Sequence, residues 1–349
     1  MSDSQGGHPL GPEGVVELAV LERSGLIESR HLGAAVVVSP DGSVLRELGD
    51  GSALVYGRSS LKLLQAIAVL RSGVALEGAQ LVIASGSHAG TPTHVAIVRD
   101  ILERAGLDED ALQCPIDWPL DGASRSAAAG PQRITMNCSG KHASFLLACV
   151  QNGWPIDSYL DPTHPLQQLI RSTVGEFVAE EDSPGEVGRV GIDGCGAPVF
   201  ATTLCGLATA VGRVAGAAAN SLFSGSDSVS DRVGDPDAAR LTVAILANPW
   251  AIDGHGRANT VVVEQLGLIA KGGAEGVMVM GAPNGTAVAL KVLDGSPRAT
   301  TLVALELLAS VGTITRADAQ RVAAVTCEKV LGGGVPVGGI RVSGLVARP

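Results

Sequence analysis

The sequence predicts an α+β protein in which an antiparallel sheet packs among helices. The chain has 349 residues, of which 46% are apolar and 17% charged, so a large buried core is expected in one domain or two closely packed subdomains. Aromatic residues make up only 3%, so this core must consist mainly of Ala, Val, Leu and Ile. The predicted strands and helices do not alternate regularly, which favours an α+β fold over a doubly wound parallel sheet.

The N-terminal part of the chain is expected to form β-structure. Residues 1–13 are predicted to be a disordered tail, and residues 14–349 a single folded unit. Short, valine-rich apolar runs separated by a Pro-Asp-Gly turn indicate antiparallel strands at 15–20, 33–38 and 44–48. Further strands are predicted at 277–280, 287–292 and 341–345.

Apolar residues at helical spacing predict most of the remaining elements. Helices are expected at 59–71, 93–105, 141–151, 166–180, 201–223, 238–246, 298–310 and 316–326. Short apolar runs at 81–84 and 189–193 lead into polar or glycine-rich turns. Residues 114–136 are rich in Pro, Ser and Gly and are expected to form a long loop, of the kind that is often functional.

The net charge of the chain argues against two classes of binding partner. The net charge is −10 and the pI about 5.2, which argues against nucleic acid and against anionic membranes. The N-terminus is polar and lacks the pattern of a signal peptide, and no apolar run is long enough to span a bilayer. A cytoplasmic location is therefore expected, with cysteines that are free or metal-bound rather than paired in disulfides.

Ser59 and Lys62 are the first candidates for catalysis. In a helix that starts at Ser59, the two side chains lie on one face, three residues apart. A serine hydroxyl needs a base to become a nucleophile, and a lysine made neutral by burial or by a second cation can be that base. The helix start would favour the developing alkoxide. The alternative is a capping serine beside a solvated lysine.

Two further segments carry the same residue types. Ser87 and His88 lie in a turn of small and polar residues that suits backbone approach to a ligand, or that is an ordinary turn with a capping serine. Lys271 precedes two glycines ahead of an apolar strand, an arrangement typical of serine acyl enzymes; the alternative is a surface hairpin.

Turn cysteines form another group of candidates. Cys138, Lys141 and His142 stand together at the start of an apolar helix, where a thiolate would be stabilised. Cys195 lies in a glycine turn next to Asp193. Two such cysteines in a reducing compartment indicate a metal pair, a redox pair or a nucleophile. A separate glycine loop carries Arg257, an anion-binding residue type.

Taken in order, these motifs resemble those of the asparaginase II family, the rhizobial-type L-asparaginases. The resemblance extends from about residue 15 to about residue 345, and it includes Glu28-Ser29-Arg30-His31-x-Gly33 near the N-terminus. The other motifs that carry it are Arg58-Ser59-x-x-Lys62, Ser87-His88-x-Gly90, Cys138-Ser139-Gly140-Lys141-His142, Asp193-Gly194-Cys195-Gly196-Ala197-Pro198, Gly254-x-Gly256-Arg257 and Lys271-x-Gly273-Ala274-Glu275-Gly276.

The resemblance implies a fold, an activity and a set of site residues. It implies a catalytic unit with the architecture of serine β-lactamases and glutaminases, usually a homodimer, that hydrolyses L-asparagine to L-aspartate and ammonia through an acyl-enzyme. Two Ser-Lys tandems would map to Ser59 with Lys62 and to Ser87 with Lys271, and which serine attacks stays open. A zinc site would map to Cys138, Lys141 and Cys195, and Asp193 would hold the substrate ammonium. Arg58, His88, His142 and Arg257 are the remaining substrate-binding candidates.

One departure and two rival functions accompany this prediction. The family commonly has cysteine two residues after the arginine of the Gly-x-Gly-Arg loop, whereas this chain has Asn259, so any role of that third cysteine is in doubt here. The first rival is another acyl serine amidohydrolase, a glutaminase or a β-lactamase-like enzyme. The second is a non-catalytic zinc- or ligand-binding relative.

Overall fold

A large antiparallel sheet organises the computed structural model, which describes residues 7–179, 187–222 and 234–348. Its strand order is β10-β11-β1-β2-β9-β8-β7, and β3 also pairs with β2. The strands are β1 (Val16–Arg23), β2 (Leu26–Val38), β3 (Val44–Leu48), β7 (Ile269–Gly273), β8 (Val277–Gly281), β9 (Ala287–Val292), β10 (Val330–Gly332) and β11 (Val335–Val342). Every pairing in this sheet is antiparallel.

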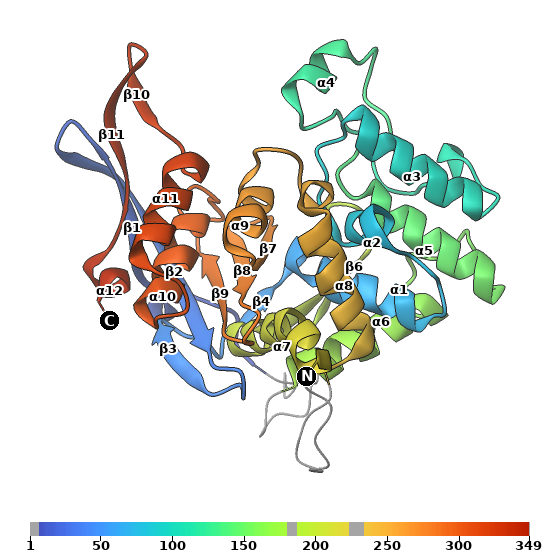
Figure 1. Cartoon of the computed structure of the whole chain (residues 1–349), viewed down its shortest axis with the longest axis horizontal. Coiled ribbons are helices and arrows are strands. Elements are labelled where there is room, and N and C mark those ends of the chain that lie inside the picture. The colour runs from blue at the N-terminus through green and yellow to red at the C-terminus, as the bar shows by residue number, and fades with distance from the viewer. Residues whose placement is uncertain (1–6, 180–186, 223–233, 349) are drawn as a thin grey trace, which may run out of the picture.

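Helices cover both faces of the middle of the sheet. α7 (Leu204–Leu222) packs against β2, β8 and β9, and α10 (Thr300–Ser310) packs against β8, β9 and β11. Because the residues of β8 and nearly all of those of β9 are buried, the two helices lie on opposite faces. α11 (Arg316–Thr326) and α12 (Gly344–Ala347) lie next to α10. The β1–β2 and β10–β11 hairpins project from one edge (Figure 1).

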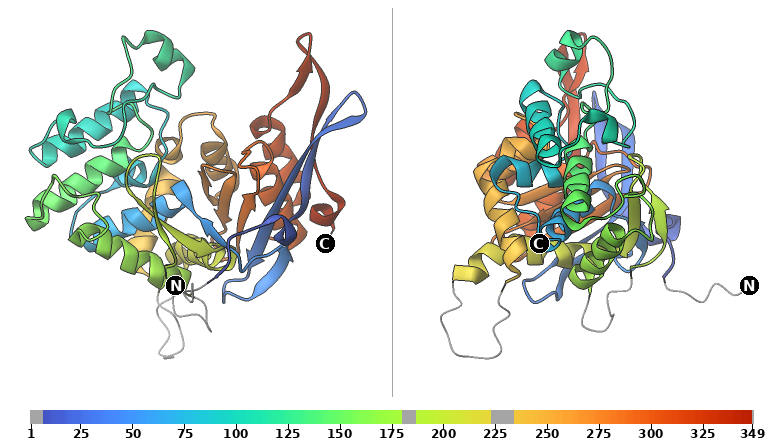
Figure 2. Two further views of the ribbon diagram at one scale, coloured as in Figure 1. Left: turned by 180° about the vertical axis from the view of Figure 1, so that it is seen from behind. Right: turned by 90° about the vertical axis from the view of Figure 1, so that its right-hand side faces the viewer.

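A helical part of the molecule stands beside the sheet (Figures 1 and 2). Its helices are α1 (Lys62–Arg71), α2 (Gly78–Ser85), α3 (Pro92–Arg104), α4 (Gly122–Ala127), α5 (Ser139–Asn152), α6 (Pro165–Val178), α8 (Pro236–Ala247) and α9 (Ala258–Leu266). A small sheet, β4 (Leu54–Tyr56), β6 (Pro198–Thr203) and β5 (Val190–Ile192), has the strand order β4-β6-β5. Short 3₁₀ helices occur at η1 (Pro12–Gly14), η2 (Arg58–Leu61), η3 (Glu109–Ala111) and η4 (Pro249–Ile252).

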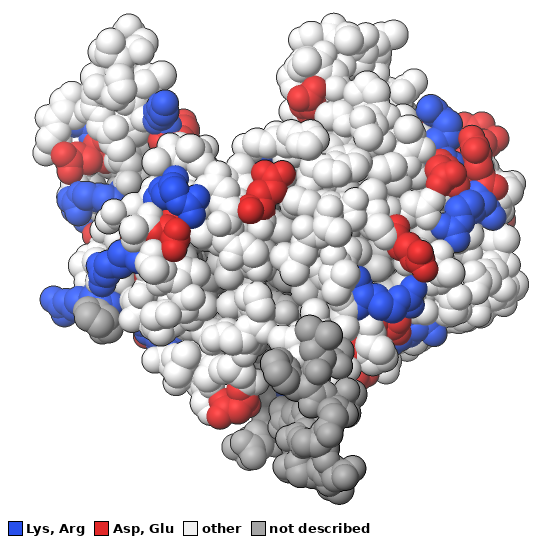
Figure 3. Space-filling model, in the orientation of Figure 1, with Lys and Arg blue, Asp and Glu red and all other residues white. Residues whose placement is uncertain are grey.

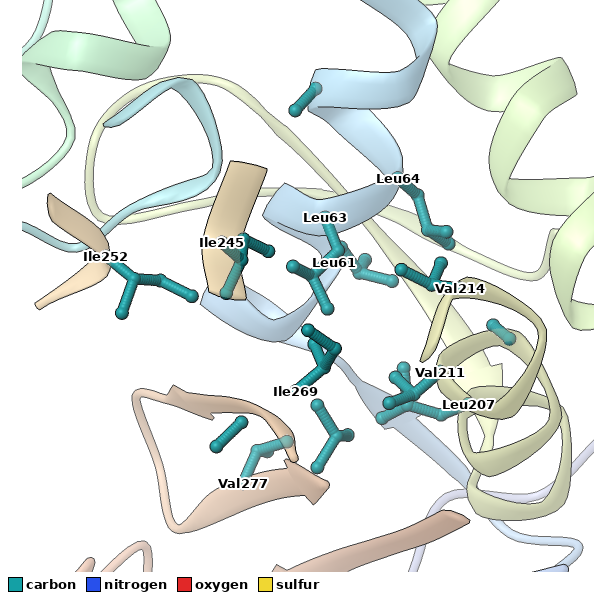
Figure 4. Close-up of a cluster of buried hydrophobic side chains, with 14 of the residues drawn as sticks. Leu61, Leu63, Leu64, Leu207, Val211, Val214, Ile245, Ile252, Ile269 and Val277 are labelled. Carbon is teal, nitrogen blue, oxygen red and sulfur yellow. The ribbon is translucent and has the colours of Figure 1, made fainter. Parts of the chain in front are cut away.

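The core joins the sheet to the helical part. Leu61 and Leu63 lie near Ile269 of β7, and Val211 and Val214 of α7 contribute to the same cluster (Figure 4). All of these side chains are 2% exposed or less. Burial of this kind stabilises the fold by roughly 1.5–3 kcal/mol per large aliphatic side chain. The start of α1 is therefore held firmly against β7.

The outer surface carries dispersed charge. Figure 3 shows a notch between the two projecting hairpins and the part of the molecule that carries α4, with Lys, Arg, Asp and Glu side chains scattered over that face.

Among the residues described, none of the helices is both long enough and apolar enough to serve as a membrane span.

The predicted fold class is confirmed, since an antiparallel sheet packs among helices without regular alternation. Several local predictions differ from the structure. The predicted loop at 114–136 contains helix α4. The run 81–84 is the end of helix α2, the stretch 201–223 begins as strand β6 before α7, and the last predicted strand ends at Val342. The predicted N-terminal tail is described from residue 7 onward, where Leu54 N donates to His8 O at 2.8 Å and η1 forms, so ordered chain starts before residue 14.

Candidate active site

Ser87 is the point on which two buried lysines converge. Lys62 Nζ donates to Ser87 Oγ at 3.0 Å, and Lys271 Nζ lies 2.8 Å from the same oxygen. Lys62 also donates to Gly86 O at 2.7 Å, and Lys271 to Gly272 O at 2.9 Å. Lys62 is 1% exposed and Lys271 is 0% exposed. One partly exposed hydroxyl is thus in contact with two buried amines.

This geometry pairs the residues differently from the expected tandems. Within the described residues, no hydrogen bond joins Ser59 Oγ to Lys62 Nζ; the Lys62 backbone N–H donates to Ser59 O instead. Ser59 lies in η2 and is partly exposed. The expected pair of Ser87 and Lys271 is in contact, and Lys62 joins it.

Three separate elements hold these groups in place. Ser87 follows α2, and its backbone N–H donates to Ile252 O at 2.8 Å. Gly86 is required there, because a Cβ at that position would lie 2.9 Å from Ala251 O. Lys62 is the first residue of α1, and Lys271 is the middle residue of β7. Lys271, expected just ahead of an apolar strand, lies within a strand itself, β7, which pairs with that apolar strand, β8.

The electrostatics of this cluster favour a neutral lysine. Burial is the largest cause that lowers the pKa of Lys271, and the charge of Lys62 lowers it further, to about 7. Asp253 acts in the opposite direction. A lysine normally titrates near 10.4. A neutral Nζ accepts a proton from a hydroxyl, so Lys271 can act as a base toward Ser87 near neutral pH.

Cys138, Lys141 and Cys195 also come together, as the sequence predicts. Lys141 Nζ donates to Cys195 Sγ at 3.1 Å, and Cys138 Sγ donates to Asn137 Oδ1 at 3.0 Å. The two cysteines shift each other in opposite directions: the neighbouring Cys138 is the main cause that lowers the pKa of Cys195, and the neighbouring Cys195 is the main cause that raises the pKa of Cys138. Burial lowers the pKa of Lys141, but the neighbouring Cys195 and Cys138 outweigh it and the net direction is upward. All three residues are buried, and the cysteines are free.

The donor types of this cluster fit zinc. Two thiolates are usual ligands of zinc, and a neutral amine nitrogen would add a third donor, with water as a fourth. His, Cys, Asp and Glu alone do not supply such a site, since no group of three or more of them is arranged to hold a metal in the part of the chain that the structure describes. Lys141 would have to supply the third ligand, and it would first lose the proton that it now donates to Cys195.

Arg58 and Asp193 meet at the more exposed side of the site. Arg58 Nε donates to Asp193 Oδ1 at 2.6 Å, and the two side chains are 21% and 12% exposed. Gly194 N donates to the same oxygen at 2.9 Å. Arg58 has φ of 50°, a left-handed conformation that is rare for residues other than glycine and that often accompanies functional sites.

The other predicted substrate-binding residues lie in the walls of the site. His88 is 0% exposed; its Nδ1 accepts from Gly90 N at 3.2 Å, and its Nε2 lies 2.9 Å from Ser139 Oγ. His142 is also buried, with Nδ1 2.7 Å from the hydroxyl of Tyr159. Arg257 Nε donates to Asp253 Oδ1 at 2.5 Å. These contacts fix loops around the site and leave no ring nitrogen of His88 for a ligand.

Sequence reasoning missed Asp253, and it noted Asn259 only as a departure from the family motif. Asp253 is 5% exposed and receives hydrogen bonds from both Arg257 and Asn259. Asn259 in turn accepts from Gly272 N at 3.0 Å, next to Lys271. The signal for Asp253 is its place directly before the glycine loop at 254–256. Nothing in the sequence indicates the partners of Asn259, because they lie on another element.

Solved structures similar to this one include glutaminases and a β-lactamase. A protein named Mglu, in its native form, is 12% identical with a TM-score of 0.37, over 81% of this chain and 61% of that chain, so this chain spans less than two thirds of it. A Bacillus glutaminase is 11% identical with a TM-score of 0.38, over 75% and 83% of the two chains. A β-lactamase from Mycobacterium bovis is 16% identical with a TM-score of 0.33, over 84% and 94%.

Comparison of the sequence with protein families identifies the family of this chain. No curated protein matches this sequence. The family model described as L-asparaginase II matches residues 19–342. That segment contains Ser87 with both lysines that contact it, as well as Ser59. It also contains the two cysteines with Lys141, and the pair of Arg58 and Asp193. The chain belongs to the L-asparaginase II family.

Proposed function

We propose that the protein is an L-asparaginase that hydrolyses the side-chain amide of L-asparagine through an acyl-enzyme. Membership of the L-asparaginase II family supports an amidohydrolase acting on a small-molecule amide. The observation that carries the mechanism is the contact of Lys62 Nζ and Lys271 Nζ with one oxygen, Ser87 Oγ. Such a hydroxyl has a base in hydrogen-bond reach, which nucleophilic catalysis by serine requires.

In the proposed reaction, a serine oxygen attacks the amide carbon while its proton passes to neutral Lys271. In the tetrahedral intermediate, the amide nitrogen takes up that proton from Lys271 and leaves as ammonia. Water then attacks the acyl-enzyme, gives one proton to Lys271 and releases aspartate, and the proton returns to the serine oxygen. Ser87 Oγ is the attacking atom that the geometry favours, because both lysines contact it. The alternative is Ser59, with Ser87 passing its proton to Lys271. Mass spectrometry of the acyl-enzyme trapped from a slow ester substrate separates the two.

Arg58 and Asp193 are proposed to bind the amino acid end of the substrate. Asp193 would accept from the α-ammonium group, and the guanidinium of Arg58 would bind the α-carboxylate, since these charge-assisted hydrogen bonds are the stronger kind. Their pairing at 2.6 Å places the two charges side by side, as a zwitterionic ligand requires.

Zinc is proposed as a ligand of Cys138, Lys141 and Cys195. When bound there, it would hold the loops that carry Cys138 and Cys195 together. Its binding would release the proton of Lys141. The homodimer and the cytoplasmic location stay predictions from the sequence.

Ammonia release from L-asparagine is the experiment that tests the proposal. L-Glutamine and a chromogenic β-lactam serve as parallel substrates for the same preparation. Faster turnover of asparagine supports the proposed activity. Preference for glutamine or for the β-lactam would assign the chain to one of the rival acyl serine hydrolases, and binding of ligand without turnover of any of the three would make it a non-catalytic relative.

A further inference from the structure

Asn259 uses both ends of its side-chain amide inside the site. Its Nδ2 donates to Asp253 Oδ2 at 3.0 Å, and its Oδ1 accepts from Gly272 N at 3.0 Å. A carboxylate only accepts and a backbone N–H only donates, so these two partners fix the orientation of the amide. Asn259 is 7% exposed, and such a buried side chain, bonded at both ends of its amide, holds its partners in place.

The two partners lie on elements that meet at the lysine cluster. Gly272 N belongs to the peptide group that follows Lys271, whose Nζ contacts Ser87 Oγ at 2.8 Å and Gly272 O at 2.9 Å. Asp253 ends η4 and also accepts from Arg257 Nε at 2.5 Å. The amide of Asn259 therefore ties the loop after η4 to the backbone that carries the base.

We propose that Asn259 is a positioning residue that sets where Lys271 Nζ meets Ser87 Oγ, and that it keeps a second negative charge away from that amine. The inference rests on the proposed function of Ser87 and Lys271 as the reacting pair. A cysteine at 259 has one weak donor and a weak acceptor on a shorter side chain, so it cannot form both bonds. This chain thus fills the position with a residue of different hydrogen-bonding capacity.

The charged surroundings of Lys271 make the second part of the inference measurable. Lys62 from α1 and Arg257 from the start of α9 lower the pKa of Lys271, next to the larger effect of burial, while Asp253 and Cys138 raise it. Asn259 adds no charge to this balance. An aspartate there would accept from Gly272 N but could not donate to Asp253, and its charge would favour protonated Lys271.

The test combines kinetics with direct titration of the lysine. The side-chain εCH₂ signals of ¹³C-labelled lysine report protonation, and replacement of Lys271 by Met assigns its signal. Few signals compete, because the lysines of this chain are Lys62, Lys141, Lys271, Lys291 and Lys329. The variants are Asn259→Ala, Asn259→Ser and Asn259→Asp. The control is Asn152→Asp, an exposed position at the end of α5 whose amide donates to Ser72 O and Ala148 O.

Asn259→Ala and Asn259→Ser are expected to lower kcat by about tenfold to a hundredfold with little change in KM, as for a misplaced catalytic group. Asn259→Asp is expected to raise the pKa of Lys271 by about one unit or more, with Asn152→Asp at the wild-type value. A merely structural role would lower Tm and leave kcat of the folded variants and the Lys271 titration unchanged, which would overturn the inference. If wild-type protein hydrolyses no amide, the proposed function fails, and the titration of Asn259→Asp alone still decides whether residue 259 controls the charge of Lys271.

Discussion

Lys271 Nζ lies 2.8 Å from Ser87 Oγ across a sequence separation of 184 residues. Lys62 reaches the same oxygen at 3.0 Å from 25 residues away. The three groups come from the start of a helix, a loop and the middle of a strand, and each is held by its own backbone contacts. This contact gives the clearest predictions for catalysis.

Replacement of Ser87 by Ala is expected to lower kcat for asparagine by roughly 10⁴-fold or more, the scale seen when one member of a catalytic unit is removed. Initial rates of ammonia release measure it. Ser59→Ala is the informative comparison, because Ser59 Oγ has no hydrogen bond to either lysine among the described residues. An equal loss in Ser59→Ala would assign that serine a role in the reaction itself. Near-wild-type kcat in Ser87→Ala would contradict the proposed centre.

Activity is expected to rise with pH through the titration of Lys271. The base must be neutral, and burial together with Lys62 lowers the pKa of Lys271 to about 7, so kcat/KM should increase from pH 6 to pH 8 and then level off. The midpoint of this rise in kcat/KM therefore lies at a lower pH than it would for an unperturbed lysine, whose pKa is near 10.4. A profile that peaks at about pH 5 would indicate a carboxylate base.

Lys62→Met is expected to raise the pH at which kcat/KM reaches half of its maximum. Removing the positive charge of Lys62 makes protonated Lys271 less unfavourable, so its pKa rises. The variant also loses a hydrogen bond to Ser87, so kcat should fall. The pH dependence of the residual kcat/KM measures the shift. Lys291→Met, on β9 and outside this cluster, is the matched control, and an unchanged midpoint pH in Lys62→Met would argue against the electrostatic coupling.

Asp193→Asn is expected to raise KM for asparagine by about tenfold to a hundredfold, because a hydrogen bond to a charged group contributes roughly 1.5–3 kcal/mol. The variant also weakens the partner contact of Arg58, so Arg58→Met should have a similar effect, and the double variant should lose less than the sum. Steady-state kinetics of the four proteins give the coupling. Fully additive losses would show that the two residues act independently.

Protein purified without chelator is expected to contain close to one zinc per chain, bound by Cys138, Lys141 and Cys195. Elemental analysis measures it, and the content should fall as pH is lowered because all three ligands must lose protons. Cys195→Ser should abolish the binding, whereas Cys327→Ser, at the cysteine that follows the C-terminal end of α11, should retain it. Absence of zinc after its addition to wild-type protein would exclude the site.

The sequence alone determined those helices and strands whose apolar residues recur at helical or strand spacing along the segment. Strand β3 at Val44–Leu48 and helix α11 at Arg316–Thr326 have the predicted bounds, since a turn or a capping residue marks their ends. The order of the motifs likewise identified the family, which the match over residues 19–342 confirms. The zinc site at Cys138, Lys141 and Cys195 stays a prediction, and the structure places Lys141 Nζ 3.1 Å from Cys195 Sγ.

Only the tertiary structure decided which serine the lysines contact. Spacing places Ser59 and Lys62 on one helix face, but Ser59 lies in a 3₁₀ segment and the Lys62 side chain extends toward the loop after α2. The position of Lys271 was also decided by the tertiary structure, because the glycines beside it do not indicate that it lies in a buried strand. The hydrogen-bond partners of Asn259 likewise could not be predicted, since they belong to two other segments of the chain. Side-chain contacts between distant segments depend on how helices and sheet pack, and no local periodicity of the chain encodes that packing.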